Sequence, residues 1–156
     1  MPEVLRRTAS DNVYLHKDFH GALSRGLDYL SERYGEDAVR QYLREFTTRY
    51  HAPLRREILS RGLVALEDHF RAMYEREGAS FRIRRTPDEL VLEVDACPAV
   101  THMRSVGYTV SPLFVETTRT VNETLCEGSP FAAELRSYRE DNGASVQRFF
   151  RRGEGT

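Results

Sequence analysis

The spacing of apolar residues changes near residue 80, and no other feature of the sequence constrains the fold as strongly. Before this point apolar residues recur every three or four positions, which is the period of a helix with one buried face. Directly after it they alternate with charged residues, which is the period of a strand with one buried face. Helical and strand periods that occupy separate blocks predict an α+β fold rather than the alternating units of a parallel sheet.

Four helices are predicted before the change, over residues 18–34, 36–51, 53–62 and 63–78. Gly35 favours a stop between the first two, and Pro53 can open the third because a proline needs no amide donor there. The buried faces are expected to contain Phe19, Leu23, Leu27, Leu30 and Tyr34 in the first helix, Val39, Tyr42, Leu43, Phe46 and Tyr50 in the second, and Leu63, Leu66, Phe70, Met73 and Tyr74 in the fourth.

Two hairpins are predicted in the second half, with two helices between them. The strands are expected over residues 80–85, 89–96, 131–140 and 144–152, and the helices over 98–107 and 111–128. Pro98 opens the shorter helix, Ser111 caps the longer one, and an Asn142-Gly143 turn joins the last two strands. Strands in adjacent pairs predict an antiparallel sheet made of two hairpins, with the helices packed on one face.

The composition fits a single globular domain of 156 residues, with 40% hydrophobic and 30% charged residues. Residues 1–12 are expected to form a loose arm, and residues 153–156 a frayed tail. A net charge of -1 gives no support to nucleic acid as a partner, and the apolar runs are too short to cross a membrane. With two cysteines and no apolar secretory segment, the chain is expected to be cytoplasmic with reduced thiols.

His16 and His20 lie four residues apart at the start of the first helix, a spacing that places both on one helical face. Two imidazoles there can bind a divalent metal ion, can bind substrate or move protons, or can only pack. A catalytic zinc ion usually takes three protein ligands, so a metal would need one more. His51, at the end of the second helix, is a candidate substrate-binding residue or a residue favoured by the helix dipole. His69 is expected to be solvated or to bond within its own helix.

Cys97 lies where a strand ends and Pro98 begins a helix. The partial positive charge of a helix N-terminus lowers the pKa of a thiol, so Cys97 is the candidate nucleophile. His102 and His20 are the candidates for moving protons. The alternative is a buried structural thiol beside an ordinary surface histidine. Cys126 precedes a helix end, which raises a thiol pKa, so it is expected to be packed.

Arg119 lies near Glu116 and Glu123 on one face of the last helix. Its guanidinium can hold a substrate carboxylate through two hydrogen bonds. Arg119, Glu116 and His51 are therefore the candidate substrate-binding residues. A row of ion pairs within the helix explains the same spacing.

Three segments occur in order over about residues 93–152: CPAVTHMRSVGY from Cys97, ETLCEG around Cys126, and NGAS before the last strand. In these segments the second half of the chain resembles the L-2-amino-thiazoline-4-carboxylic acid hydrolase family (ATC hydrolase family). More distantly, the layout is similar to four-vinyl-reductase and TRAPP-subunit α+β domains. The resemblance implies hydrolytic opening of a cyclic amidine-like thiazoline ring, with Cys97 and Cys126 as the matching cysteines. The chain departs from the family at Arg119, where another cysteine is common, and at 146–148, where some members carry His-Cys-Asp.

These observations are compatible with three classes of function: an enzyme, a ligand-binding module and an interaction subunit. The leading hypothesis is a small hydrolase acting on a C–N bond of a nitrogen- or sulfur-containing heterocycle or a carboxylated amidine, with or without a divalent metal. The alternative is a small-ligand-binding or sensory module of the same fold. An interaction subunit would instead expose an apolar helix face and form a homodimer. Catalysis predicts that the paired histidines, Cys97 and His102 converge on one pocket, whereas dispersed histidines favour binding.

Overall fold

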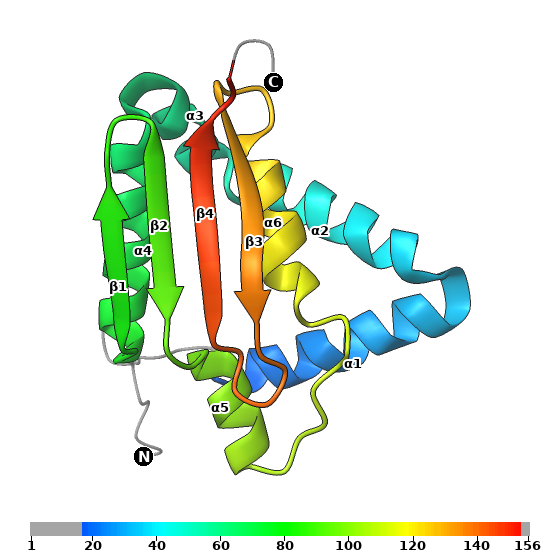
Figure 1. Cartoon of the computed structure of the whole chain (residues 1–156). Helices are drawn as coiled ribbons and strands as arrows, with labels where there is room; N and C mark the ends of the chain where they lie inside the picture. Colours follow the sequence, from blue (N-terminus) through cyan, green and yellow to red (C-terminus); the bar gives the residue numbers. More distant parts are fainter. Residues whose placement is uncertain (1–16, 154–156) are drawn as a thin grey trace, which may run out of the picture.

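A computed structural model describes residues 17–153 and shows an α+β fold, as the sequence predicts (Figure 1). Within this range the chain forms four helices, a hairpin, two further helices and a second hairpin. The expected arm over 1–12, His16 and most of the expected tail lie outside the described residues. None of the helices in the described range combines the length and the apolar character needed to cross a membrane.

The four N-terminal helices are joined by single residues. Their bounds are α1 Lys17–Tyr34, α2 Glu36–Tyr50, α3 Ala52–Arg61 and α4 Leu63–Glu77. Two of the joints are glycines with positive φ, 89° at Gly35 and 68° at Gly62, a conformation that other residues rarely adopt. Helices α1 and α2 form a hairpin that projects past one edge of the sheet, whereas α4 lies against the sheet (Figure 1).

Four strands form one antiparallel sheet in the order β1-β2-β4-β3. Their bounds are β1 Phe81–Arg85, β2 Glu89–Val94, β3 Phe131–Tyr138 and β4 Ser145–Arg151, and the helices between the hairpins are α5 Pro98–Ser105 and α6 Glu116–Cys126. Strand β4 pairs with β2, so β1 and β3 are the edges. The pairing of β3 with β4 shifts register between Leu135 and Ser137.

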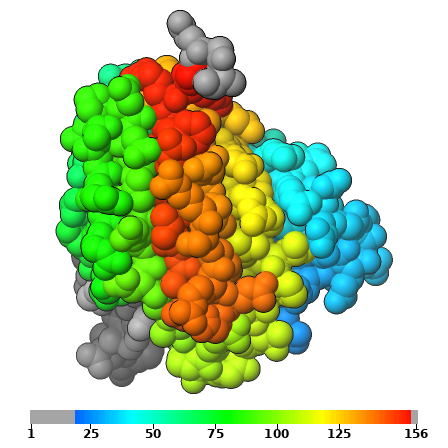
Figure 2. Space-filling model, in the orientation of Figure 1, coloured from blue at the N-terminus to red at the C-terminus, as the bar shows by residue number. Residues whose placement is uncertain are grey.

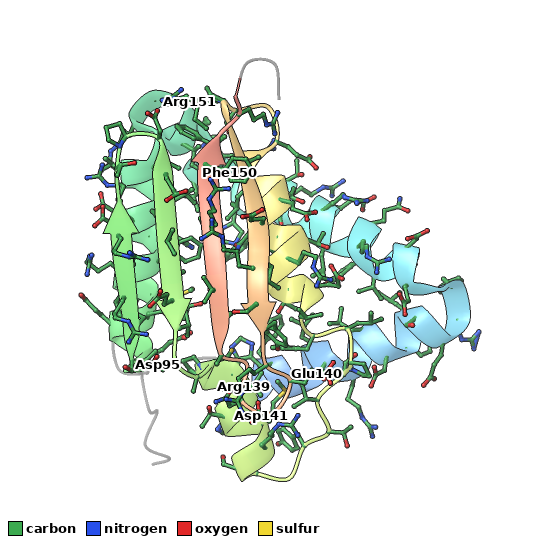
Figure 3. All side chains as sticks on the ribbon, viewed as in Figure 1. Asp95, Arg139, Glu140, Asp141, Phe150 and Arg151 are labelled. Carbon is green, nitrogen blue, oxygen red and sulfur yellow. The ribbon has the colours of Figure 1, made fainter. Side chains whose placement is uncertain are left out.

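The outer face of the sheet is not covered by helices and carries ion pairs (Figures 1 and 2). Arg148 of β4 lies between Glu89 and Glu134, at 2.7 and 3.3 Å. Arg82 pairs with Glu93 across β1 and β2 at 3.0 Å. Figure 3 shows charged side chains over the strands of this face. Exposed ion pairs contribute about 0–1 kcal/mol each, so this face is mainly a solvated surface.

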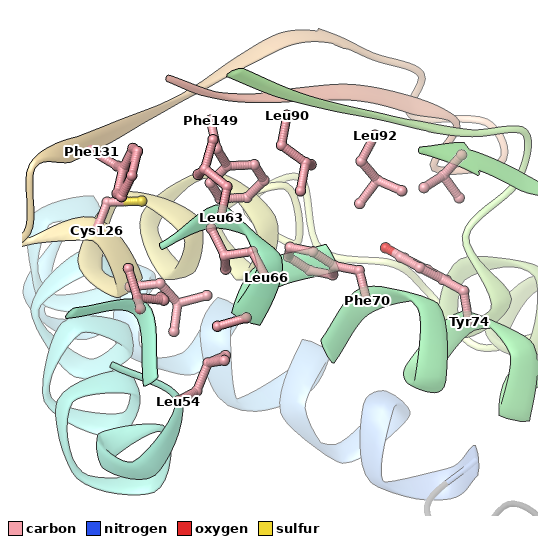
Figure 4. Packing of buried hydrophobic residues seen from close by; sticks show 14 residues of the cluster. Leu54, Leu63, Leu66, Phe70, Tyr74, Leu90, Leu92, Cys126, Phe131 and Phe149 are labelled. Carbon is pink, nitrogen blue, oxygen red and sulfur yellow. The ribbon is translucent and has the colours of Figure 1, made fainter. Parts of the chain in front are cut away.

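The larger core lies between the sheet and helices α3, α4 and α6 (Figure 4). Leu90 and Leu92 of β2 and Phe149 of β4 point into it, because alternate residues of a strand share a face, and all three are fully buried. The other buried members are Leu54, Ile58, Leu63, Ala65, Leu66, Phe70, Tyr74, Val94, Leu125, Cys126 and Phe131.

A second core joins α1, α2, α5 and the segment before α6. Its buried members are Leu27, Val39, Leu43, Ala99, Val100, Met103 and Phe114. Val121 of α6 packs against both cores. Helix α6 therefore connects the helical hairpin to the sheet.

Four aromatic residues that the sequence places on buried faces are exposed. The exposed fractions are 53% at Phe19, 67% at Tyr34, 45% at Tyr42 and 70% at Tyr50. The α1–α2 hairpin projects past the sheet, so only a narrow stripe of each helix meets other elements. The last helix also begins later than predicted, at Glu116, because residues 112–115 form turns.

Candidate functional site

Cys97 precedes the first turn of α5 and lies against the β3–β4 turn. Its amide donates a hydrogen bond of 2.8 Å to the carbonyl of Asn142. A Cβ atom built on Gly143 would lie 2.5 Å from the Cys97 Cβ, so the turn fits there only because residue 143 has no side chain. The segments CPAVTHM and NGAS, far apart in the sequence, are therefore neighbours in the fold.

Burial raises the pKa of the Cys97 thiol, and this effect exceeds the opposite influence of the Val100 and Ala99 backbone amides. The negative charge of Glu77 raises that pKa further. The sequence-based prediction of a lowered pKa is wrong, because it considers the helix terminus and not the burial. The resting group at neutral pH is the thiol, which needs a base to become nucleophilic.

Three side chains from other elements are coupled to Cys97 through their charges: Glu77 affects the pKa of Cys97, and Cys97 affects the pKa of Tyr74 and of Tyr138. Tyr74 and Glu77 come from the end of α4, and Tyr138 ends β3. Burial raises the pKa of both phenols, to about 12 at Tyr138, and a charge on Cys97 raises both further. Burial also raises the pKa of the Glu77 carboxyl, against the influence of Arg76. We call Tyr74, Glu77, Cys97 and Tyr138 the Cys97 cluster.

A buried series of polar side chains leads from α6 towards the Cys97 cluster. Asn122 Nδ2 donates to Gln147 Oε1 at 2.7 Å, and Gln147 Nε2 donates to Ser145 Oγ at 3.0 Å. The Gln147 side chain also lowers the pKa of Tyr74 through a hydrogen bond, but the larger effect of burial raises that pKa. Because deeply buried polar groups require partners, these bonds hold β4 and α6 in one arrangement beside the cluster.

The sequence gives little sign of the residues that surround Cys97. Tyr74 follows the apolar period of α4 and is predicted only as a core residue. Glu77 ends that helix beside Gly78, where an acid is expected to face water. Tyr138 lies at the end of a strand. Only tertiary structure brings these three side chains to the start of α5.

The histidines predicted to act with Cys97 lie in other surroundings. His102 follows Cys97 by five positions, or about 140° around a helix axis, so the two side chains leave different sides of α5. The His20 ring of α1 packs edge-on against Phe114, with centroids 6.4 Å apart. His16 lies outside the described residues, so the predicted metal-binding pair stays a prediction.

Glu116 is almost fully buried at the start of α6. Its carboxylate accepts hydrogen bonds from Arg119 Nη1 at 2.8 Å and from Thr120 Oγ1 at 2.6 Å, and Arg40 Nε lies 3.6 Å away. Arg119 is thus engaged within its own helix, as the ion-pair alternative expects. His51 follows Arg40 by eleven positions, about 16 Å along α2. The three predicted substrate-binding residues therefore do not form one site.

His51 joins α2 to α3 and faces His69 of α4. The ring centroids are 5.6 Å apart and the ring planes meet at 87°. Burial lowers the pKa of both imidazoles, and the charge of His51 helps to bring that of His69 to about 4. His69 is half-buried rather than fully solvated, and its ring contacts both His51 in the joint between α2 and α3 and Phe70 of its own helix. The two rings line a hollow of about 460 Å³ together with Tyr50, Pro53, Leu54, Glu57, Arg61, Ala65 and Asp68.

The second cysteine makes no further site, and the described residues form no metal-binding cluster. Cys126 is fully buried in the larger core, as predicted, and burial raises its pKa to about 12. Within residues 17–153, no three His, Cys, Asp or Glu side chains are grouped so that they could hold a metal ion.

Comparison of the chain with protein-family models, with curated proteins and with solved structures found no match. Function must therefore be inferred from the side chains themselves.

Proposed function

We propose that the protein is a small hydrolase that acts on a C–N bond of a cyclic amidine-like substrate, with Cys97 as the nucleophile. The convergence of a thiol, a carboxyl group of raised pKa and two phenols from three elements carries the proposal. Groups with shifted pKa values that gather in one place are enriched at catalytic sites. The resemblance to the ATC hydrolase family supports hydrolytic opening of an amidine-like ring, and two of the segments that resemble the family meet at Cys97.

Glu77 is the proposed base, because a carboxyl group whose pKa is raised toward neutrality transfers protons efficiently. The thiol of Cys97 adds across the C=N bond of the substrate. Sulfur bonds to the carbon, and the thiol proton passes through Glu77 to the ring nitrogen. The adduct collapses when the C–N bond to the ring nitrogen breaks: a proton from the second amidine nitrogen passes to the departing amine, and a C=N bond forms at the carbon that carries the Cys97 sulfur. Water then adds its hydroxyl group to this carbon and its proton to the nitrogen. The hydroxyl proton passes to the departing Cys97 sulfur as the C–S bond breaks, which leaves a carbonyl group and restores the thiol.

The remaining groups of the cluster position the substrate in this scheme. Tyr74 and Tyr138 keep their protons at neutral pH because burial raises their pKa, so both can donate hydrogen bonds. The backbone amides at the start of α5 favour negative charge on sulfur. The roles predicted for His20, His102 and Arg119 are not needed in this scheme and stay predictions.

A ligand-binding or sensory module without catalysis is the second candidate. The neutral resting thiol of Cys97 and the separation of His20, His102 and His51 in the fold favour it. In either case we expect a small-molecule ligand and a cytoplasmic location, where free thiols persist. A homodimer stays a prediction.

A turnover assay tests the proposal. The purified full chain is incubated with L-2-amino-thiazoline-4-carboxylate and with ring analogues that lack the sulfur or the carboxylate, and products are measured by mass spectrometry. Cys97→Ala is expected to lower the rate at least about 100-fold. Cys126→Ala, the matched change at the buried cysteine, is expected to keep most of the rate. Equal rates in wild type and Cys97→Ala contradict the nucleophilic role.

The role of Glu77 is tested by two measurements that move in opposite directions. Glu77→Gln removes the proposed base and is expected to slow turnover. The same change removes a negative charge that raises the pKa of Cys97, so alkylation of Cys97 by iodoacetamide near pH 8 is expected to become faster. Faster alkylation together with unchanged turnover contradicts the role of Glu77 as base. Binding of the ring compounds without turnover in the wild type favours the second candidate.

A further inference from the structure

The hollow beside His51 and His69 lies apart from the Cys97 cluster. Helices α3 and α4 and the joint between α2 and α3 form its walls. His69 and Tyr74 both belong to α4, but five positions separate them, which places their side chains about 140° apart around the axis. Tyr74 points to the sheet, as Figure 4 shows. A volume of about 460 Å³ is within the range of small-ligand sites.

A series of rings in edge-to-face contact holds the imidazoles in place. Tyr50 meets His51 with centroids 5.0 Å apart at 89°, and His51 meets His69 at 5.6 Å and 87°. His69 in turn meets Phe70 at 5.2 Å and 68°. The series leads from the exposed Tyr50 to the buried Phe70. The imidazoles are therefore fixed by packing on both sides, as a preformed site requires.

The hydrogen-bonding groups of the hollow are mostly acceptors. Arg61 pairs with Asp68 at 2.5 Å and lies 3.8 Å from Glu57. The guanidinium of Arg61 thus faces two carboxylates, so these three residues, which form the rim of the hollow, carry a net negative charge. Burial lowers the pKa of His51 and His69, so each ring is neutral at pH 7 and offers one acceptor nitrogen.

We propose that this hollow binds a small amidinium or guanidinium cation. The N–H donors of such a cation match the neutral imidazoles and the carboxylates of Glu57 and Asp68. Its flat apolar body fits against Leu54 and Ala65, and the Tyr50 ring adds a cation–π contact. An anion would instead meet two carboxylates and a guanidinium that is already engaged. The proposal does not depend on catalysis at Cys97.

The test uses three probes of one shape on the full chain at pH 7.5. Benzamidinium is cationic, benzamide is neutral and benzoate is anionic, and their affinities are measured by titration calorimetry. Benzamidinium is expected to bind with a Kd of about 1 mM or tighter and at least about tenfold more tightly than either other probe. In two-dimensional NMR, the ring protons of His51 and His69 are expected to shift on its addition.

Matched variants locate the site. Asp68→Asn and Glu57→Gln each remove one rim charge at an exposed residue and are expected to weaken benzamidinium binding about fivefold or more. Asp88→Asn makes the same charge change on the turn between β1 and β2, beside Arg151, and is expected to leave the Kd unchanged.

Four results would overturn the proposal. They are no saturable binding of benzamidinium, equal affinity for benzamide, tighter binding of benzoate, or equal weakening by Asp88→Asn and Asp68→Asn. Loss of turnover in the Cys97 variants has no bearing on these results, so the two proposals fail separately.

Discussion

At the scale of single residues, burial decides the charge state of the groups that matter here. Cys97 lies at a helix N-terminus, which favours a thiolate, yet burial raises its pKa. His69 lies among Glu67, Asp68 and Arg71 in the sequence, which suggests a solvated ring, yet burial lowers its pKa to about 4. Sequence shows the local charges, but the desolvation comes from elements that are distant in the chain.

The lowered pKa of His69 makes the fold depend on pH. In the unfolded chain His69 binds a proton below about pH 6.5, whereas in the folded chain it binds one only below about pH 4. The unfolded state therefore binds more protons between these values, so stability falls as the pH falls from 6.5 to 4. The loss amounts to at most about 3 kcal/mol.

Urea unfolding at several pH values between 4 and 7 measures this dependence. His69→Gln is expected to reduce the slope of the unfolding free energy against pH by up to about one proton. Asp88→Asn, which lies outside the hollow, provides the control for general effects of charge. A slope in His69→Gln equal to that of the wild type would show that His69 is not held neutral by the fold.

At the scale of elements, α5 and the β3–β4 turn form one unit. Besides the bond from Cys97 to Asn142, Arg104 Nη2 donates to the carbonyl of Glu140 at 2.8 Å. Arg139, Glu140 and Asp141 lie beside α5 (Figure 3). The position of Cys97 therefore depends on a turn that follows it in the chain only after two helices and a strand, α5, α6 and β3.

Gly143→Ala tests this dependence. Residue 143 has φ +71° and its added Cβ would lie 2.5 Å from the Cys97 Cβ, so we expect a loss of about 3 kcal/mol in unfolding free energy. Gly78→Ala is the matched control, because φ is +69° there and the added Cβ meets open space. It is expected to cost about 1 kcal/mol. Equal losses in the two variants, measured by urea unfolding, would mean that the turn does not press on Cys97.

The elements themselves were largely predictable, because each has a clear period and clear terminal residues. Pro53 and Pro98 open the helices that the sequence assigns to them, and Gly35 ends α1. The exposed aromatic residues of α1 and α2 were not predictable, since a period indicates an apolar face but not which element covers it. Tyr34 illustrates this, because it lies at the end of the projecting hairpin and is 67% exposed.

At the scale of the whole molecule, α6 and β4 meet through polar groups inside an otherwise apolar interior. Asn122 and Gln147 are 7% and 2% exposed and bond to each other at 2.7 Å. The sequence placed Cys97 at a helix start, but it gave no sign of this pair, since its members belong to separate elements. The same limit applies to the pair His51 and His69.

A double-mutant cycle tests the importance of this bond. Asn122→Ala leaves the side-chain oxygen of Gln147 buried without its donor, so we expect a loss of about 2 kcal/mol. Gln147→Leu alone leaves Asn122 without its acceptor and is expected to cost a similar amount. The double variant is expected to lose less than the sum of the two, by about 1 kcal/mol. Strict additivity, measured by thermal and urea unfolding, would show that the bond adds no coupling.

The irregularity between Leu135 and Ser137 breaks the even row of amide and carbonyl groups along the outer edge of β3. A second chain adding a strand there would find its donors and acceptors out of step. The opposite edge strand, β1, carries Arg82, Arg84 and Arg85, and charged edge strands resist such addition. Growth of the sheet into fibres is therefore hindered at both sides, and concentrated solutions of the folded protein are expected to remain free of amyloid-like aggregates.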